Sequence, residues 1–342
     1  MSIGKIRKCI MPVLAALLIC ATATLHAQPH QALVVTATNA AGNQLLVYSA
    51  KGALLQTLST EGKGGASGNA GGVEAKNGLV AAVNFGSQSV SLFERREDGL
   101  QLTQVIPTVT SPLSVAFGED HLYILGTKTI ESHQMYGHEV SSHADGFQTL
   151  LKADGSAAQV GVLPGQLIIT EKSNVIESVG LSDGAVTTLP SLVNNIPSNV
   201  NAPFGLVTRG DKAYVTIAHA NEISLVRHDE VLTVTGSGTQ SAPCWVTLTG
   251  PFLFSSNSPS KSVSRYVVFG DSIVQDLAVA ASLNGNPTDI ASGAGLIAVI
   301  DGNGTASHLS IFKVDFEGNL KLEIAKTMGA GANGVAVVEE ND

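Results

Sequence analysis

Basic residues are scarce in this chain, and they are not clustered. The 342 residues include 19 Lys and Arg against 28 Asp and Glu, which gives a formal net charge of −9. Proteins that bind nucleic acids present a concentrated basic patch to the phosphate backbone. The sequence therefore predicts that nucleic acid is not a partner of this protein.

Cysteine is also rare, with three residues in the whole chain. Cys9 and Cys20 lie in the N-terminal segment, so Cys244 is the cysteine that we expect in the mature protein. A single thiol cannot form an internal disulfide bond. Cys244 stands between a proline and the only tryptophan, and we expect a buried small side chain there rather than a nucleophile.

Long hydrophobic runs are absent beyond the N-terminus, where one apolar run covers residues 10–21. Three basic residues, the last of them Lys8, precede this run and Ala27 follows it, which is the order of a secretory signal peptide. The run is shorter than the ~20 residues that a transmembrane helix needs. We predict a signal peptide over residues 1–27, and a single domain over residues 28–342 that is secreted or periplasmic.

A sustained helical period of 3.6 residues is absent from the mature chain. Apolar runs are instead short, rich in β-branched residues and followed by alternating runs, as in the pair AYVTIAH and EISLVRH. Glycine, proline, asparagine and aspartate interrupt these runs at regular intervals. This pattern is typical of short strands separated by tight turns, so the fold class is predicted to be all-β.

The strands belong to a repeat of 40 to 46 residues, which begins each time with a proline or a small residue at the start of a strand. Repeats of this length with four strands each are typical of β-propeller blades, including WD40-like ones. The first residues of the seven units are Ala70, Pro112, Ala157, Pro203, Pro243, Pro287 and Ala332.

The two ends of the chain indicate how the ring closes. After Ala332 there is room for one strand, whereas the first unit, from Leu33 to about Thr60, lacks an innermost strand. We therefore predict that the C-terminal strand completes the N-terminal blade of a seven-bladed propeller with four-stranded antiparallel blades. Such closure removes the exposed sheet edges that an open array would leave.

The blade sequences share a pattern, which is a strand, G-x-L, a second strand and N-x-x-S-x-S-V-S-x-F. It is seen in GGVEAKNGLVAAVNFGSQSVSLFERREDGLQL and in PTDIASGAGLIAVIDGNGTASHLSIFKVDFEGNLKL. Over essentially all of the mature chain this pattern resembles the lactonase-type seven-bladed propellers, which include 6-phosphogluconolactonase-like, carboxymuconate-cyclase-like and YVTN-repeat proteins. The resemblance implies chemistry on a small lactone or sugar acid, carried out by a histidine, a glutamate and arginines on one face of the ring.

The arginines of this chain depart from the arrangement that the resemblance implies. They map to outer strands, or to turns on the side of the ring opposite the loops that would carry the site. These residues are Arg95, Arg96, Arg209, Arg227 and Arg265. The departure favours a binding function over lactone chemistry.

Candidate ligand-binding residues come from the loops between the second and third strands of the blades, which emerge together around the central channel. Loops that a rigid scaffold holds in place are where function tends to sit. A polar ring there is suited to hydrogen bonding a sugar, a lactone or a peptide, although the asparagines also have the alternative role of forming tight turns. The ring consists of Asn39, Asn84, Thr127, Lys172, Asn257 and Asp301, and all of these except Thr127 are candidate ligand-binding residues.

Two residues of the same loops, Glu171 and His219, are the candidates for catalysis. Histidine is the commonest general base near neutral pH, and both residues lie where the resemblance to the lactonase-type propellers implies catalytic groups. The alternative is that His219 is a solvated loop residue.

No cofactor or metal site is predicted. Residues 301–305 offer oxygen ligands on alternate positions, as the start of a calcium loop does, but Phe312 stands where the carboxylate of the twelfth position is expected. A divalent ion such as calcium is therefore the weaker alternative. Residues 62–72 are rich in glycine but lack the Gly-Lys-Ser/Thr ending of a phosphate loop, so they are predicted to be a flexible connection between blades.

These observations favour an exported, monomeric propeller that acts as a binding or interaction module. Its partner would be a small polar ligand or a protein that contacts the polar ring. The alternative function is a lactonase-like hydrolase or cyclase that uses Glu171 and His219. A fold of this kind hosts both classes of function, so the site has to decide between them.

Overall fold

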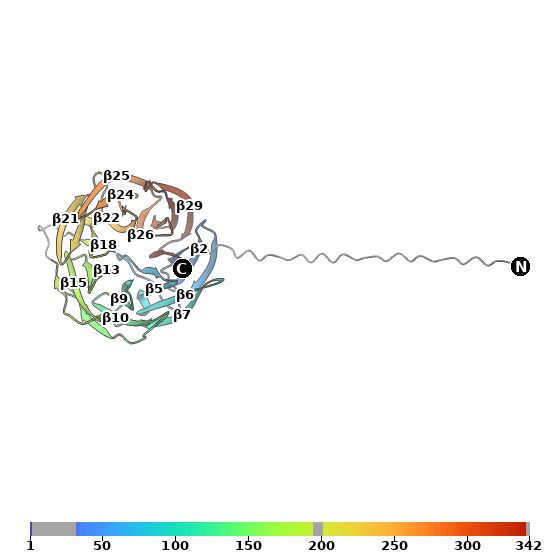
Figure 1. Ribbon diagram of the computed structural model, residues 1–342, viewed down its shortest axis with the longest axis horizontal. Helices are drawn as coiled ribbons and strands as arrows, with labels where there is room; N and C mark the ends of the chain where they lie inside the picture. Colours follow the sequence, from blue (N-terminus) through green and yellow to red (C-terminus); the bar gives the residue numbers. More distant parts are fainter. Residues whose placement is uncertain (2–31, 194–200, 340–342) are drawn as a thin grey trace. The chain divides into compact units, whose positions relative to one another are not determined.

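The computed structural model describes residues 32–193 and 201–339, together with Met1 (Figure 1). The predicted signal peptide lies, apart from Met1, outside the described residues. Within them, no helix is long and apolar enough to cross a membrane. Two short 3-10 turns, η1 (Phe85–Ser87) and η2 (Ala218–Ala220), accompany an otherwise all-strand set of described elements.

The strands form seven antiparallel sheets, which are the blades of a ring (Figure 1). From the innermost strand outwards, the first four blades consist of β30 (Val335–Val338), β1 (Leu33–Ala37), β2 (Gln44–Ser49) and β3 (Leu54–Ser59) in blade 1; β4 (Val73–Lys76), β5 (Leu79–Asn84), β6 (Ser89–Arg96) and β7 (Gly99–Pro107) in blade 2; β8 (Pro112–Phe117), β9 (His121–Gly126), β10 (Thr129–Tyr136), β11 (Glu139–Val140) and β12 (Gly146–Thr149) in blade 3; and β13 (Ala157–Leu163), β14 (Gln166–Glu171), β15 (Val175–Ser182), β16 (Ala185–Val186) and β17 (Ser191–Leu192) in blade 4.

The remaining three blades are regular four-stranded sheets. In the same order they consist of β18 (Pro203–Arg209), β19 (Lys212–Ile217), β20 (Glu222–Arg227) and β21 (Glu230–Gly236) in blade 5; β22 (Pro243–Thr249), β23 (Phe252–Asn257), β24 (Ser262–Phe269) and β25 (Ser272–Ser282) in blade 6; and β26 (Asn286–Gly293), β27 (Leu296–Gly302), β28 (Ala306–Val314) and β29 (Leu320–Gly329) in blade 7. Blades 3 and 4 differ because two short strands share their outermost position.

Blade 1 is built from both ends of the described chain. β30 pairs antiparallel with β1, with Val338 opposite Leu33 and Val335 opposite Thr36. The innermost strands contact one another in the order β30, β4, β8, β13, β18, β22, β26 and back to β30. The predicted seven-bladed propeller, closed by the C-terminal strand, is therefore confirmed.

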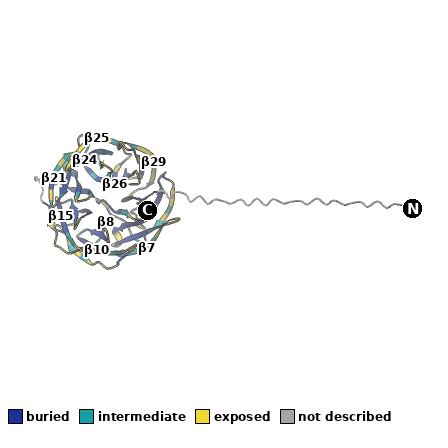
Figure 2. Ribbon diagram, viewed as in Figure 1, coloured by how far each residue is buried: buried dark blue, intermediate teal, exposed yellow. Residues whose placement is uncertain are grey.

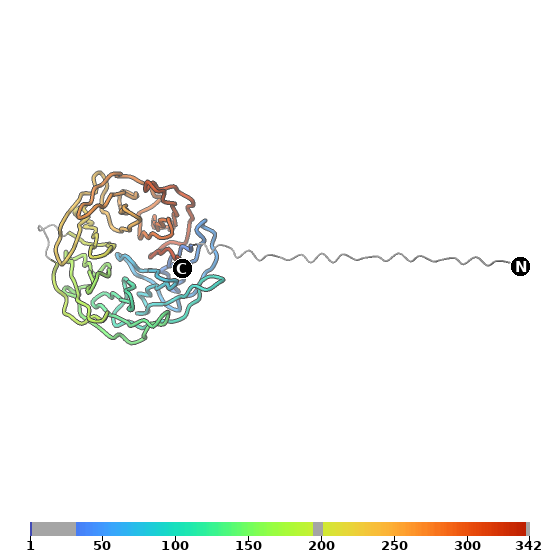
Figure 3. The backbone as a smooth tube through the Cα atoms, in the orientation of Figure 1, coloured from blue at the N-terminus to red at the C-terminus, as the bar shows by residue number. Residues whose placement is uncertain are grey.

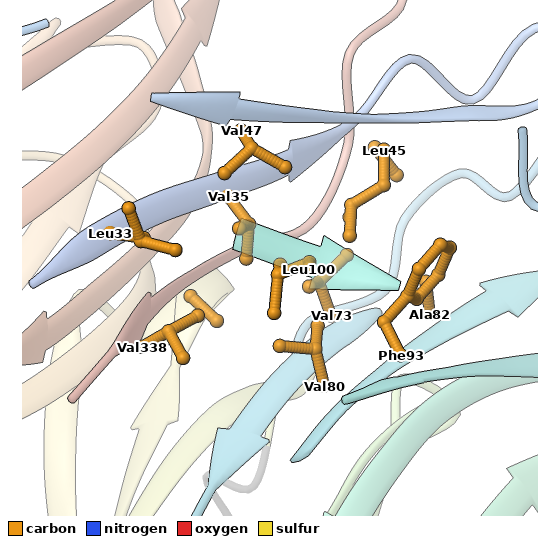
Figure 4. Packing of buried hydrophobic residues seen from close by; sticks show 12 residues of the cluster. Leu33, Val35, Leu45, Val47, Val73, Val80, Ala82, Phe93, Leu100 and Val338 are labelled. Atoms are coloured by element: carbon orange, nitrogen blue, oxygen red, sulfur yellow. The ribbon is translucent and has the colours of Figure 1, made fainter. Parts of the chain in front are cut away.

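Apolar side chains packed between neighbouring sheets hold the blades together. Every residue of the inner strand β5 is buried, whereas the outermost strand β29 contains no buried residue, and Figure 2 shows this gradient around the ring. In Figure 4, Val35 and Val47 of blade 1 belong to the same cluster as Val80 of blade 2. Full burial of one such side chain contributes about 1.5–3 kcal/mol, so these clusters are a major source of stability.

The ring has two faces with different kinds of connection. We call one the loop face, because it carries the loops between the second and third strands of each blade and the connections to the next blade. We call the other the hairpin face, because it carries the turns between the first and second strands and between the third and fourth. Each innermost strand begins at the loop face and ends at the hairpin face.

A glycine-rich segment crosses the loop-face end of the central channel. We call residues 61–72 the strap, and Figure 3 shows the light-blue chain running into the middle of the ring at this point. The N–H of Ala70 donates to the carbonyl of Ala158 in blade 4 at 3.1 Å, and the N–H of Val115 in blade 3 donates to the carbonyl of Gly71 at 2.9 Å. The segment connects blades 1 and 2, as predicted, but these hydrogen bonds hold it across the channel, whereas the sequence led us to expect a flexible connection.

Asn69 anchors the strap to other blades around the axis. Its Nδ2 donates to the carbonyl of Leu113 in blade 3 at 2.7 Å, and its Oδ1 accepts a hydrogen bond from Asn333 Nδ2 at 2.9 Å. The indole N–H of Trp245 in blade 6 donates to the carbonyl of Asn69 at 3.0 Å. Asn69 is 1% exposed. Groups from opposite parts of the ring thus meet at one residue, and the strap covers the channel at the loop face.

Val338→Asp should prevent ring closure and strongly destabilise the protein. The Val338 side chain is fully buried opposite Leu33, and a buried carboxylate without a partner costs several kcal/mol. Leu322→Asp, on the exposed strand β29, is the matched control and should change the free energy of unfolding by less than about 0.5 kcal/mol. Thermal unfolding followed by circular dichroism measures both, and equal melting temperatures would contradict the role given to β30.

Candidate functional site

The central channel contains a cavity of about 350 Å³ beneath the strap. A second cavity of about 220 Å³ adjoins it, and the two share Glu74, Gln159 and Thr208 among their lining residues. Arg209 lines the first cavity and Lys76 lines the second, and each is the last residue of its innermost strand. The joined cavities therefore extend toward the hairpin face, away from the loops that supplied the predicted site.

Two carboxylates from innermost strands line this channel. Glu74 belongs to β4 of blade 2 and Asp289 to β26 of blade 7, so the two flank blade 1, where the ring closes. Asp289 is 3% exposed. Its Oδ1 accepts the N–H of Ile290 at 2.9 Å, and its Oδ2 accepts the N–H of Val335 at 3.1 Å. The strand β30 therefore closes the ring and also orients Asp289.

Burial raises the pKa of both carboxyl groups toward neutrality. Desolvation is the main cause for Glu74, whose pKa rises to about 7. Desolvation is also the main cause for Asp289, whose pKa rises to about 8 with a contribution from the nearby charge of Glu74, against the opposing backbone hydrogen bonds. A pair that titrates near neutral pH is able to accept and return protons, as general acid–base catalysis requires.

Neutral polar side chains surround the two carboxylates. Gln159 Oε1 accepts the N–H of Leu206 at 2.7 Å, which fixes this side chain between blades 4 and 5. The hydroxyl groups of Thr247 and Ser292 lie 2.7 Å apart, and Ser292 also donates to the carbonyl of Leu248 at 2.8 Å. A cavity with a few oriented polar groups around a reactive pair is suited to a small polar ligand.

Two of the predicted ligand-binding residues lie inside blades. Asn84 and Asn257 are fully buried, and their Nδ2 groups donate to Ser91 Oγ at 2.7 Å and to Ser264 Oγ at 2.8 Å. The N-x-x-S-x-S-V-S part of the repeat therefore joins the second and third strands of one blade through side-chain hydrogen bonds. This observation gives the asparagines a structural role, and ligand binding by them stays a prediction.

Asp301 and Asn39 also have partners within the protein. Asp301 is fully buried, and its Oδ1 lies 2.8 Å from Nδ1 of His308. Asn39 Oδ1 accepts the N–H groups of Gly65 and Ala66 in the strap at 2.7 and 2.9 Å. Among the described residues, no group of three or more His, Cys, Asp and Glu side chains is arranged to hold a metal ion. The calcium alternative gains no support from these contacts.

The predicted catalytic residues lie in different environments. Glu171 is fully buried in blade 4, where its Oε1 accepts the N–H of Lys152 at 3.1 Å, whereas His219 is exposed in η2 of blade 5. Lys172, next to Glu171, donates from Nζ to the carbonyl of Gly68 in the strap. This hydrogen bond of Lys172 helps to hold the strap in place. The role of Glu171 and His219 as a catalytic pair stays a prediction.

A further carboxylate, Glu177, interacts with Glu171 in the interior of blade 4. Burial raises the pKa of both groups, and the charge of Glu171 helps to raise the pKa of Glu177 to about 7. Glu177 Oε2 accepts the N–H of Leu151 at 2.8 Å. The other oxygen of each carboxyl, Glu171 Oε2 and Glu177 Oε1, is buried without a hydrogen-bond partner. Both carboxyl groups lie inside a blade, so their ionisation lowers the stability of the folded protein.

Sequence reasoning missed Glu74 and Asp289 because it looked for the site in loops. Both residues follow shortly after the start of a repeat unit, in the strings GGVEA and PTDIA. The available signal was an acidic residue inside an innermost strand, where neighbours of the same strand are apolar. A charge in a buried strand is costly, and such a residue is a candidate for function.

Solved structures with the same architecture include proteins that are described as lactonases. A putative 6-phosphogluconolactonase from Bacteroides uniformis matches with a TM-score of 0.67 at 16% sequence identity, over 90% of this chain and 100% of that one. The periplasmic gluconolactonase PpgL of Pseudomonas aeruginosa matches with a TM-score of 0.65 at 13% identity, over 91% of this chain and 99% of that one. This chain has the lactonase-type propeller fold.

A more distant match is virginiamycin B lyase from Staphylococcus aureus, with a TM-score of 0.54 at 13% identity, over 75% of this chain and 84% of that one. No protein-family model and no curated protein sequence matches the chain. At these identities the likeness concerns the fold, which agrees with the resemblance seen in the blade sequences.

Glu177→Gln should stabilise the protein at alkaline pH. Because the pKa of Glu177 in the folded state lies above its ordinary value, stability falls as the pH rises from about 4.5 through 7. Glutamine keeps an acceptor for Leu151 and removes the charge that burial disfavours. We expect a gain in unfolding free energy of roughly 2–3 kcal/mol at pH 8 and little change near pH 4.5.

Chemical denaturation at the two pH values measures this difference. Glu323→Gln is the control, because Glu323 is exposed on the outer strand β29. An equal effect of Glu177→Gln at both pH values would show that Glu177 does not titrate as described.

Proposed function

We propose that this protein is an exported hydrolase of small lactones and that the channel beneath the strap is its active site. The observation that carries the proposal is the position of Glu74 and Asp289 in one cavity on the propeller axis, each with a pKa near neutrality. The lactonase-type fold supports it, since two of the similar structures are described as a gluconolactonase and a putative 6-phosphogluconolactonase. The lactone alternative is thus preferred to a binding module.

In the proposed reaction, Glu74 is the general base. Its carboxylate accepts a proton from a water molecule as the water oxygen attacks the carbonyl carbon of the lactone. When the tetrahedral intermediate collapses, the bond between the carbonyl carbon and the ring oxygen breaks, and the ring oxygen takes a proton from the carboxyl pair. The product is the open-chain hydroxy acid. A base with a pKa near 7 is well matched to this task at neutral pH.

Asp289 acts as a positioning residue in this scheme. It is almost fully buried, and two backbone N–H groups fix its carboxyl. Protonated Asp289 retains a proton close to Glu74 and keeps the negative charge in the channel low enough for Glu74 to ionise. Gln159 lines the same cavity and offers an amide group for the lactone carbonyl.

The substrate proposed for this site is a small sugar lactone. Arg209, which sequence reasoning placed on the side away from the site, lines the channel, because the channel extends toward the hairpin face. Its guanidinium and the ammonium of Lys76 supply positive charge near the carboxylate of the product. Since one ring supplies all of these groups, we propose that the protein acts as a monomer on a small molecule, outside the cytoplasm.

Glu74→Gln should abolish lactone hydrolysis while the protein remains folded. Removal of a general base costs about 10²- to 10⁴-fold in kcat, and KM should change little because the amide has nearly the same shape. In the wild type, kcat/KM should rise with pH through about 7, where Glu74 ionises, and fall again above about 8, where Asp289 loses its proton. The assay measures acid release from a panel of aldonolactones and aliphatic lactones, corrected for spontaneous hydrolysis.

Two control variants make this test specific. Glu171→Gln alters a buried carboxylate that does not line the channel, and His219→Ala alters the exposed histidine predicted from the sequence. Both should retain turnover. Loss of activity in His219→Ala together with full activity in Glu74→Gln would move the active site to the loop face and refute the channel proposal.

A further inference from the structure

A separate pocket of about 580 Å³ lies on the loop face, on the opposite side of the strap from the channel cavities. We call it the loop-face pocket. Strap residues Ala66 to Asn69 form one of its walls, whereas Ala70 and Gly71 of the same strap line the channel. The other walls come from the loop-face ends of blades 5, 6, 7 and 1. The volume is within the range of about 300–1,000 Å³ that is usual for small-molecule sites.

Two aromatic side chains give this pocket a rigid apolar wall. Phe204 and Trp245 meet edge to face, with ring centroids 5.2 Å apart and an interplanar angle of 78°. The hydrogen bond from the indole N–H of Trp245 to Asn69 fixes the orientation of the larger ring. Trp245 also lines the channel, so its ring separates the two cavities. A wall that is fixed before binding loses little conformational entropy when a ligand arrives.

No charged side chain lines the pocket. None of the described residues that line it is Asp, Glu, Lys, Arg or His, and burial raises the pKa of the Cys244 thiol in its wall to about 12. At its edge, the Lys172 ammonium donates to Gly68 and lies 5.8 Å from the Phe204 ring centroid. A cationic ligand that entered would therefore lose its hydration without gaining an ion pair. The channel differs in this respect, because two carboxylates, an arginine and a lysine line its cavities.

Amide and hydroxyl groups surround the apolar wall. They include Ser67, Ser258, Asn286 and Thr288, which come from the strap and from two blades. A pyranose or furanose ring presents an apolar face of C–H groups together with a rim of hydroxyl groups. Its face would pack against the aromatic wall, and its rim would exchange hydrogen bonds with these side chains.

We propose that the loop-face pocket is a binding site for a neutral sugar ring, separate from the channel. It is independent of the proposed lactone hydrolysis, because it shares no charged residue with the channel. The two sites would be occupied from opposite faces of the propeller, with the strap and Trp245 between them.

Trp245 is the only tryptophan of the chain and lines both the pocket and the channel, so its fluorescence reports on a ligand in either cavity, and the pocket-filling variants assign the signal to the pocket. Titration with D-glucose, D-galactose and D-mannose should give a saturable change in emission for at least one sugar. Glucosamine, which keeps the sugar ring but carries a positive charge, should bind at least about tenfold more weakly. A disaccharide that binds as well as its monosaccharide identifies the end of a glycan as the ligand, and exclusion of the disaccharide identifies the free sugar.

Gly302→Leu fills the pocket and should weaken sugar binding by about tenfold or more. Gly302 lines the pocket, and a Cβ atom there would meet its nearest neighbours, Ala306 O and Ser307 Oγ, at 3.6 and 3.8 Å, which are ordinary contacts. Gly236→Leu is the matched control, since Gly236 ends a strand of blade 5 outside the pocket and has similar free space. Ser67→Tyr, at an exposed strap position, fills the pocket from another side.

Two outcomes overturn the proposal. One is the absence of a saturable emission change with every neutral sugar at millimolar concentration. The other is binding that survives in both Gly302→Leu and Ser67→Tyr while the melting temperatures of the variants equal that of the wild type. Glu74→Gln distinguishes this site from the channel, because it should remove lactone turnover and leave the sugar titration unchanged.

Discussion

The antiparallel pairing of β1 with β30 joins strands from opposite ends of the described chain in one blade, and the channel depends on this pairing. The closure of so long a loop costs entropy, which the inter-blade clusters offset only when the ring is complete. Glu74 and Asp289 belong to the blades on either side of this junction, and Val335 of β30 donates to Asp289. The proposed acid–base pair therefore forms only in the closed ring.

Burial raises the pKa of carboxyl groups in two parts of this molecule, and the consequences differ. In the channel, desolvation places the pKa values of Glu74 and Asp289 where a proton is exchanged near neutral pH. In blade 4, the same physical effect on Glu171 and Glu177 yields no cavity-facing group and lowers stability at high pH. Access to a cavity, rather than the size of the pKa shift, distinguishes a candidate catalytic carboxyl from a buried carboxyl that only lowers stability.

The repeat made the fold predictable, because spacing and alternation report directly on strands and turns. The site was less accessible to sequence reasoning. Asn84 and Asn257 looked like loop residues, yet they bond serines within their own blades. Glu74 and Asp289 are far apart in the sequence, and only ring closure brings their strands to one axis. The strap's path across the channel depends on the side chain of Asn69, which no repeat pattern encodes.

The strap covers the channel at the loop face, and the channel cavities extend toward the hairpin face. In the proposed reaction, substrate and product would then share the route at the hairpin face, so a product molecule would have to leave before the next substrate arrives. The same barrier isolates the two faces, so a molecule on the loop face does not obstruct that route. Trp245, whose indole N–H is bonded to Asn69, is part of this barrier, because it lines the cavities on both sides of the strap.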